Sequence, residues 1–249
     1  MSDDLQKVYC SNQLVREIDV GLRKKWPNPI TRATKANELI TKIQIPHDDY
    51  YDPSLVRGAL GELTTSYILE VVQYARKVMV KNGLIIRTAD NRTTQLDHLI
   101  LGANCGICLE VKTLYGNIVI DDDVIYQLTP QRTLEHKAWR QNFHHIYTLK
   151  EQLGGEDIYF YNVVLLLGDC NVHVKSIRKG NQLLGYRGSV KNLITLIDSK
   201  PRTPPREDKL KKFIANVNRL PRESEIEHIQ NVQNDKSKGD SLWKRLINL

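Results

Sequence analysis

The sequence of 249 residues predicts an α/β fold with a mixed β-sheet. Three observations support this class: a long amphipathic helical pattern at 54–76, several short strand-like runs at 77–113, and a continuous apolar run at 159–167 that follows a second helical pattern. Helical and strand patterns that alternate in this way are typical of a sheet covered by helices. The chain is long enough to bury a sizeable core without a disulfide or a metal ion.

The N-terminal residues 1–53 are expected to form a helical extension. Helices are predicted at 12–25 and at about 32–43, and the Pro27-Asn28-Pro29 segment separates them. From 54 to 76, apolar residues recur at intervals of three and four positions, which predicts a helix with Ser54 as its N-cap.

Strands follow this helix. Short strands are predicted at 77–80 and 84–87, and the Asn82-Gly83 dipeptide between them favours a hairpin. Further strands are expected at 95–101 and 106–113.

A second helix is predicted at 132–153, with Trp139, Phe143, Ile146 and Leu153 along its buried stripe.

The apolar run 159–167 predicts a central strand buried on both faces. A strand at 172–177 and a helix at 189–197 complete the core. The chain is thus predicted to have four segments: an extension at 1–53, a core domain at 54–198, a Pro-rich linker at 199–206 and a basic helical segment at 207–249. Within the last segment, helices are predicted at 208–219, 223–232 and 241–249.

Charge is distributed unevenly along the chain. The net charge is +7, but the residues after 170 carry 17 Lys and Arg against 8 Asp and Glu, whereas the first 170 residues carry a net charge of −2. A basic segment on a near-neutral body favours a nucleic-acid partner, and a merely solubilising basic surface is the alternative.

Membrane and export functions are not expected. The longest aliphatic run, 163–167, is far shorter than a membrane span, and the start of the chain lacks a signal-peptide pattern. Cys10, Cys105, Cys108 and Cys170 are sparse and irregularly spaced, so we expect reduced thiols in a cytoplasmic protein.

Two neighbouring strands carry the candidate catalytic residues. Alternation in 106–113 places Glu110 and Lys112 on one face of that strand. On the preceding strand, Gln95 and Asp97 share a face, and the turn between the strands allows Asp97 to lie beside Glu110. Two converging carboxylates repel each other unless a cation lies between them, and divalent cations prefer oxygen ligands. A nearby lysine could then orient water or stabilise a phosphoryl transition state, although a structural ion pair would use the same residues.

Four short motifs occur in a fixed order over about 54–170. They are Gly58-Ala-Leu-Gly61-Glu62, Thr94-Gln95-Leu96-Asp97-His98, Glu110-Val111-Lys112 followed by Tyr115-Gly116-Asn117-Ile118, and Arg140-Gln141-Asn142-Phe143-His144-His145. With these motifs the sequence resembles the nuclease-related domain (NERD) family, a branch of the PD-(D/E)xK nuclease superfamily.

The resemblance implies a restriction-endonuclease-like αβββαβ core and cleavage of DNA that depends on Mg²⁺, with Mn²⁺ as a substitute. Ala138-Trp139 stands where the family usually has Asn-Pro before the helix glutamine. The implied roles are Asp97 and Glu110 as metal ligands, the Val111 carbonyl as a third ligand, Lys112 as the catalytic lysine, Glu62 as a helix-borne acid that helps to hold metal or water, Gln141 as a polar residue of the second helix, and Gln95 as a family-type position.

The second predicted helix also carries cationic groups that could follow a phosphate backbone, namely Arg132, Lys137, Arg140, His144 and His145. A solvated helix face is the alternative. Three further alternatives stay open: a catalytically silent nucleic-acid-binding module on the same fold, a metal-independent HEPN-type ribonuclease that uses Arg140 and His145, and RNA rather than DNA as the partner. A protein partner or a second copy of the chain also stays open.

Overall fold

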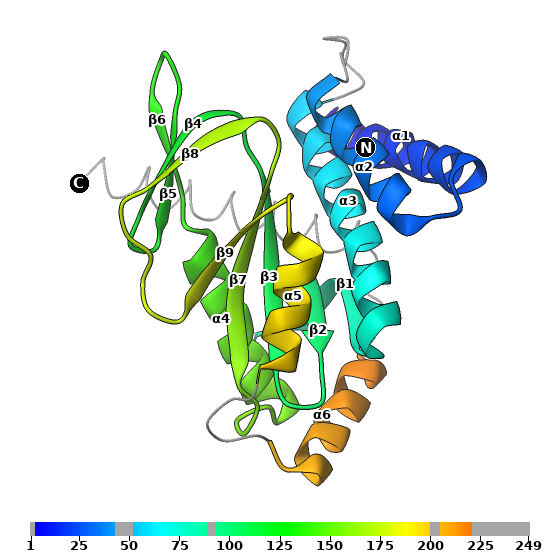
Figure 1. The fold of residues 1–249 in the computed structure, drawn as a ribbon, viewed down its shortest axis with the longest axis vertical. Helices are drawn as coiled ribbons and strands as arrows, with labels where there is room; N and C mark the ends of the chain where they lie inside the picture. Colours follow the sequence, from blue (N-terminus) through cyan, green and yellow to red (C-terminus); the bar gives the residue numbers. More distant parts are fainter. Residues whose placement is uncertain (1–2, 43–51, 89–92, 200–204, 221–249) are drawn as a thin grey trace.

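A five-stranded mixed sheet forms the centre of the structure, a computed structural model that describes residues 3–42, 52–88, 93–199 and 205–220 (Figure 1). Its strand order is β1-β2-β3-β7-β9. The first three strands are antiparallel, and β7 and β9 run parallel to β3. The strands are β1 (Met79–Arg87), β2 (Thr93–Leu101), β3 (Gly106–Thr113), β7 (Phe160–Leu167) and β9 (Asn181–Gly185).

A second, four-stranded sheet extends from the first one. It was not predicted as a sheet, although the strand predicted at 172–177 overlaps one of its four strands. Its order is β6-β5-β4-β8, and β4 and β8 directly follow β3 and β7 and preserve their parallel pairing. Gly168, at a φ of +95°, allows the turn from β7, since a Cβ there would lie 2.3 Å from the Leu114 carbonyl oxygen. The strands are β4 (Gly116–Asp121), β5 (Val124–Leu128), β6 (Thr133–His136) and β8 (Cys170–Val174).

Helices cover both faces of the central sheet. Helices α3 (Pro53–Arg76) and α5 (Ser189–Asp198) pack on one face, and α4 (Ala138–Leu153) and α6 (Glu207–Arg219) share a core on the other (Figure 1). The mixed α/β class predicted from the sequence is therefore confirmed. Within the described residues, no helix is both long enough and apolar enough to cross a membrane.

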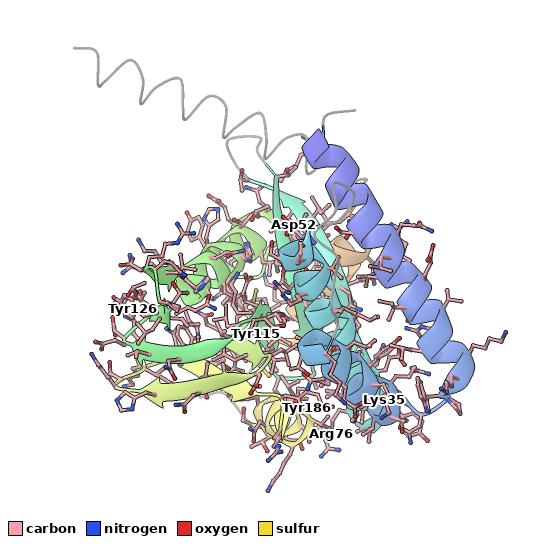
Figure 2. The ribbon with its side chains drawn as sticks, turned by 90° about the horizontal axis from the view of Figure 1, so that it is seen from above. Lys35, Asp52, Arg76, Tyr115, Tyr126 and Tyr186 are labelled. Atoms are coloured by element: carbon pink, nitrogen blue, oxygen red, sulfur yellow. The ribbon has the colours of Figure 1, made fainter. Side chains whose placement is uncertain are left out.

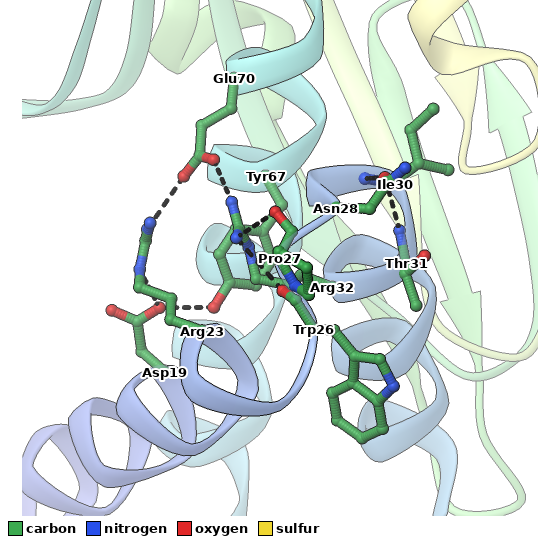
Figure 3. Close-up of polar contacts among 10 residues, drawn as sticks. All are labelled: Asp19, Arg23, Trp26, Pro27, Asn28, Ile30, Thr31, Arg32, Tyr67 and Glu70. Carbon is green, nitrogen blue, oxygen red and sulfur yellow. Dashed lines mark hydrogen bonds and ion pairs between the residues drawn. The ribbon is translucent and has the colours of Figure 1, made fainter.

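Two N-terminal helices, α1 (Asp3–Lys25) and α2 (Pro29–Lys42), pack against α3. Glu70 of α3 accepts hydrogen bonds from Arg23 of α1 and from Arg32 of α2 (Figure 3). Arg32 is buried and also donates to the carbonyl oxygens of the α1–α2 turn, while the Tyr67 hydroxyl donates to Asp19. Ion pairs at the edge of an apolar interface therefore link all three helices.

Tyr115, labelled in Figure 2, links α2 to the second sheet. Its hydroxyl donates to the Ile40 carbonyl at 2.7 Å, and its own carbonyl accepts the Gln127 amide at 3.0 Å. The Arg57 guanidinium of α3 lies 5.4 Å from the centre of the Tyr115 ring. The turn between β3 and β4 is thus held from three directions.

The structure agrees with the sequence prediction for several elements. The strand predicted at 106–113 is β3 with the same bounds, the buried strand predicted at 159–167 is β7, and α5 and α6 lie where helices were expected. Cys105, Cys108 and Cys170 carry free thiols. The helices predicted at 223–232 and 241–249 lie outside the described residues.

Other local predictions are wrong. Asp52, not Ser54, is the N-cap of α3, because its carboxylate accepts the amide hydrogens of Ser54 and Leu55. Asn82-Gly83 does not turn the chain: both residues lie within β1, which pairs continuously along β2. The segment 132–137 is the strand β6 and its flanks rather than helix, so α4 begins only at Ala138.

A close approach between α3 and β3 depends on Gly61. A Cβ at this position would lie 2.2 Å from the Thr113 hydroxyl oxygen, whereas a Cβ at Gly58 would meet nothing within 4 Å. We expect Gly61→Ala to lower the free energy of unfolding by about 1–3 kcal/mol, because the helix or Thr113 must move. Urea unfolding followed by circular dichroism measures the change.

Gly58→Ala is the matched control on the same helix. It should leave stability unchanged or raise it by about 0.5–1 kcal/mol, because alanine is the better helix former. Adding Thr113→Ala to Gly61→Ala should recover part of the loss. An equal effect of the two glycine variants would contradict the close approach.

Candidate active site

The candidate site lies where β2 and β3 separate. Backbone pairing of these strands ends at His98 and Leu109, although β2 continues its pairing with β1 as far as Thr93. Beyond this point, the Asp97 carboxylate accepts the Val111 amide hydrogen with an N–O distance of 2.8 Å. A side chain thus replaces the backbone partner of β3.

Glu110 and Lys112 lie on one face of β3, as strand alternation predicted. The Lys112 ammonium donates to Glu110 Oε1 at 2.7 Å. The Glu110 side chain is only 2% exposed and the Lys112 side chain 25%. Glu110 Oε2 is buried and has no hydrogen-bond partner, so half of this carboxylate is unsatisfied.

Both acids are costly to ionise at these positions. Burial, together with the negative charge of Asp97, raises the pKa of Glu110 to about 7, and the Lys112 charge opposes this shift only in part. Burial also raises the pKa of Asp97, against the lowering effect of the Val111 amide and of Lys112. Additional positive charge at this position would relieve both shifts.

The donor set suits a hard divalent cation. Asp97 and Glu110 supply carboxylate oxygens, one of them buried and unpartnered. The amide of Val111 faces Asp97, and in a strand the carbonyl of the same residue points to the same side. In the described part of the chain, no group of three or more His, Cys, Asp and Glu side chains could hold a metal ion. Mg²⁺ commonly uses one or two carboxylates and completes its shell with water and phosphate, so the residues fit.

Helix α3 approaches the site from the opposite face of the sheet. Gly61 packs against Thr113 and Val111, next to Lys112 on β3. Glu62 follows Gly61 and is partly buried, but it forms no three-acid group with Asp97 and Glu110. Its role as a metal ligand stays a prediction.

Helix α4 presents Asn142 rather than Gln141 to the sheet. Gln141 is exposed, whereas Asn142 is buried and its amide donates to the carbonyl oxygens of Cys108 and Val163, at 2.6 and 3.1 Å. It also donates to Asn162 at 3.0 Å. Sequence reasoning missed Asn142, although it lies three positions after the buried Trp139, a helical spacing that places both on the same face.

Three buried or partly buried histidines surround this region. His145 is 1% exposed, so the surface role predicted for it in phosphate binding is wrong. Burial, with contributions from His144 and Lys112, lowers the pKa of His145 to about 4. Burial and Lys112 likewise lower the pKa of His136, which sequence reasoning missed. Burial lowers the pKa of His98 to about 3, and its Nδ1 contacts Asn82 at 2.9 Å.

The predicted cationic helix face is divided between elements. Arg132 precedes β6 and Lys137 precedes α4, so neither lies on the helix. Arg140 and His144 are exposed on α4, and Arg140 forms an ion pair with Asp123 at 2.8 Å. Gln95 is partly buried on β2, opposite Ile85 of β1.

Comparison with known families agrees with this geometry. Residues 57–167 match the model of the nuclease-related domain family, NERD. The chain contains a NERD domain. No curated protein and no solved structure matches the chain. The matched NERD residues begin in the first turns of α3, end at the last residue of β7 and include Asp97, Glu110 and Lys112.

The mixed sheet removes one alternative. HEPN ribonucleases were expected to be all-helical, whereas Arg140 and His145 lie on a helix that packs on a mixed sheet. His145 is buried and Arg140 pairs with Asp123, so the two side chains do not form an accessible catalytic pair. The metal-independent ribonuclease hypothesis is therefore wrong.

The raised pKa of Glu110 predicts a pH-dependent stability of the metal-free protein. An acid whose pKa is 4.5 when unfolded and about 7 when folded binds more protons in the folded state, so its contribution to stability falls as the pH rises through this window. We expect Glu110→Gln to remove this contribution, because glutamine cannot ionise, so the variant should gain stability relative to wild type as the pH rises. Thermal unfolding in EDTA at several pH values between about 5 and 8 measures it.

Glu38→Gln is the matched control. Glu38 is a partly exposed glutamate whose pKa is lowered by the hydrogen bond from Lys35, so its replacement should leave the pH profile between these values unchanged. Parallel pH profiles for wild type and Glu110→Gln would contradict the raised pKa.

Proposed function

We propose that this protein is a Mg²⁺-dependent nuclease that hydrolyses phosphodiester bonds of DNA. The observation that carries the proposal is the arrangement on β2 and β3, in which Asp97, Glu110 and Lys112 converge inside a matched NERD domain. The unpartnered Glu110 oxygen supports a cation at this position. Mn²⁺, which also accepts oxygen ligands, would be the expected substitute.

Asp97 and Glu110 would hold the ion, together with the Val111 carbonyl. Asp97 is oriented by the Val111 amide, and Glu110 is oriented by Lys112. When bound, Mg²⁺ supplies positive charge to the phosphoryl group and favours ionisation of water. The side chains are held by the two strands before substrate arrives, so little reorganisation is needed at the reaction.

Lys112 has two tasks in this proposal. In the metal-free protein it neutralises part of the Glu110 charge. Because its side chain is a quarter exposed, its ammonium can also approach a phosphate oxygen or a water molecule at the surface of the site. A lysine in this position would stabilise the negative charge that develops on the phosphate during attack.

A catalytically silent binding module is the second candidate function. The basic residues after position 170 would bind nucleic acid with or without turnover. The paired acids favour the enzyme, because a binding surface for phosphates gains nothing from two buried carboxylates that must be neutralised.

Cleavage assays test the proposal directly. Plasmid DNA and single-stranded DNA and RNA are incubated with wild type, Asp97→Ala and Lys112→Ala, in Mg²⁺ or in EDTA. We expect wild type to cut DNA only with Mg²⁺, and each variant to lose at least about 100-fold in rate, because each removes a charged group from the transition state.

The control is Lys191→Ala, an exposed lysine of α5 on the other face of the sheet. It should cut at the wild-type rate. Cutting that persists in EDTA, or equal cutting by all variants, would refute the proposal. Tight binding of DNA by folded wild type without any cutting would favour the silent module.

Metal binding can be measured without activity. In the absence of DNA, millimolar Mg²⁺ should raise the thermal unfolding midpoint of wild type at a pH above that of Glu110 ionisation, because the ion binds only the folded state. Glu110→Gln and Asp97→Asn should lose most of this increase, since each removes one negative ligand. An increase of equal size in Glu110→Gln would place the ion elsewhere.

A further inference from the structure

A hollow of about 600 Å³ lies beside α4, apart from Glu110. Helix α4, the first residues of β7 and the loop before β9 enclose it. The volume lies in the range of pockets that bind small molecules. We call it the α4–β9 hollow; the lining residues used below are Asp123, Arg140, Phe143, Lys150, Tyr159, Arg178 and Lys179.

The residues that line the α4–β9 hollow carry a net positive charge. Four of its described lining residues are Lys or Arg, and Asp123 is the one acid among them. Asp123 is almost fully buried and pairs with Arg140 at 2.8 Å and with Arg178 at 3.3 Å. Arg178 also pairs with the Asp122 carboxylate. Both arginines are still 56% exposed, so the two acids fix their positions while leaving part of each guanidinium accessible to an anion.

Two aromatic side chains face solvent in the same hollow. Phe143 is 65% exposed and Tyr159 is 43% exposed, which is unusual for rings of this size. Phe143 was expected to lie in the core, so its exposure is not explained by packing of α4. Tyr159 contacts Tyr161 edge to face, with 4.9 Å between the ring centres, and Lys150 lies 5.9 Å from the centre of the Phe160 ring.

Exposed rings among cations are the features of a single-strand binding site. Bases stack on aromatic side chains, and Lys and Arg neutralise the phosphates between them. Paired bases in a duplex are already stacked on each other and cannot reach rings inside a hollow. An acidic protein segment would use the cations but would leave the two rings without a stacking partner.

We propose that the α4–β9 hollow binds one or two unpaired nucleotides of a single-stranded DNA segment. Bases stack on Phe143 and Tyr159, and phosphates contact Arg140, Lys150, Arg178 and Lys179. The assignment to DNA rests on the proposed nuclease function. The inference adds that the enzyme holds unpaired nucleotides next to its site, and so selects substrates with a single-stranded part.

The position of the hollow agrees with this role. Asn162 lines it and pairs with Cys108 in the β3–β7 ladder, two residues from the pair of Glu110 with Val164. Two residues of a strand span about 7 Å. Arg140, in the first turn of α4, also lines the hollow, and His136, just before that helix, is close enough to feel the Lys112 charge. A single strand of DNA bound in the hollow can therefore continue past the start of α4 to Lys112.

Binding in EDTA tests the inference without cleavage. Fluorescence anisotropy measures the affinity of the full chain for a labelled oligothymidylate of about 15 nucleotides and for a duplex of equal length. We expect wild type to prefer the single strand. Phe143→Ala/Tyr159→Ala should weaken single-strand binding about 10- to 100-fold, because two stacking surfaces are removed, and should change duplex binding little.

The charge contribution is tested separately. Lys150→Gln/Lys179→Gln should reduce the slope of log affinity against log salt by about 0.7 for each phosphate that is no longer neutralised. The controls lie on the other face of the sheet: Tyr74→Ala replaces an α3 ring that is 92% exposed, and Lys191→Gln replaces an exposed α5 lysine. Neither should change affinity or slope.

Each outcome bears on one proposal. Unchanged single-strand affinity in the folded Phe143/Tyr159 variant would overturn the inference, as would displacement of the single strand by polyglutamate at equal charge. If the hollow variants lose single-strand binding but wild type cuts nothing in Mg²⁺, the inference holds and the nuclease proposal fails. If wild type cuts DNA and the hollow variants bind normally, only the inference fails.

Discussion

The hydrogen bond from the Val111 amide to the Asp97 carboxylate determines where the central sheet opens. An antiparallel ladder between β2 and β3 would otherwise continue and pair the backbone of Val111 with β2. Because the Asp97 side chain accepts this amide hydrogen, the backbones of β2 and β3 can separate while a hydrogen bond still joins the two strands. Glu110 and Lys112 then lie beside an edge that the sheet itself has provided. The chemistry of the site is thus a consequence of one interrupted ladder.

The same arrangement concentrates negative charge inside a basic protein. Glu110 is almost completely buried and is balanced by a single lysine, and Asp97 is close enough to raise its pKa. Buried like charges of this kind lower stability unless a cation joins them. In the proposed function, the basic residues after position 170 would attract a polyanion at longer range. The net charge of +7 is therefore the sum of two opposite local charges: acidic residues at the candidate site and basic residues after position 170.

Sequence reasoning succeeded where one physical signal dominated. The bounds of β3 follow from alternation and those of β7 from its continuous apolar residues, and both strands are central and buried. The convergence of Asp97 with Glu110 followed from the same alternation. In contrast, Asn82-Gly83 favours a turn locally, but the pairing of β1 with β2 on both sides of it overrides this preference.

The second sheet was not predicted, although the strand expected at 172–177 overlaps its strand β8. Its strands are only four to six residues long and pair mainly with one another, and no pattern in the sequence indicates that they form a separate sheet. The helical pattern also did not predict which individual side chains of α4 are buried. Asn142, Phe143 and His145 all lie within one turn of apolar positions, and only the contacts with the sheet decide that the phenylalanine is outside and the asparagine and histidine are inside. Polar groups buried by hydrogen bonds to strand carbonyls carry no apolar signal.

Glu70, held between Arg23 and Arg32, has a consequence for how this chain is divided. Helices α1 and α2 lie before the matched family residues, yet Leu22, Ala36 and Ile40 belong to the same apolar core as α3 and β3. The segment that matches the family and the segment that folds as one unit are therefore different. The family match begins at residue 57, whereas the apolar core extends back through both N-terminal helices, so a substitution in this extension can displace β3 through packing alone.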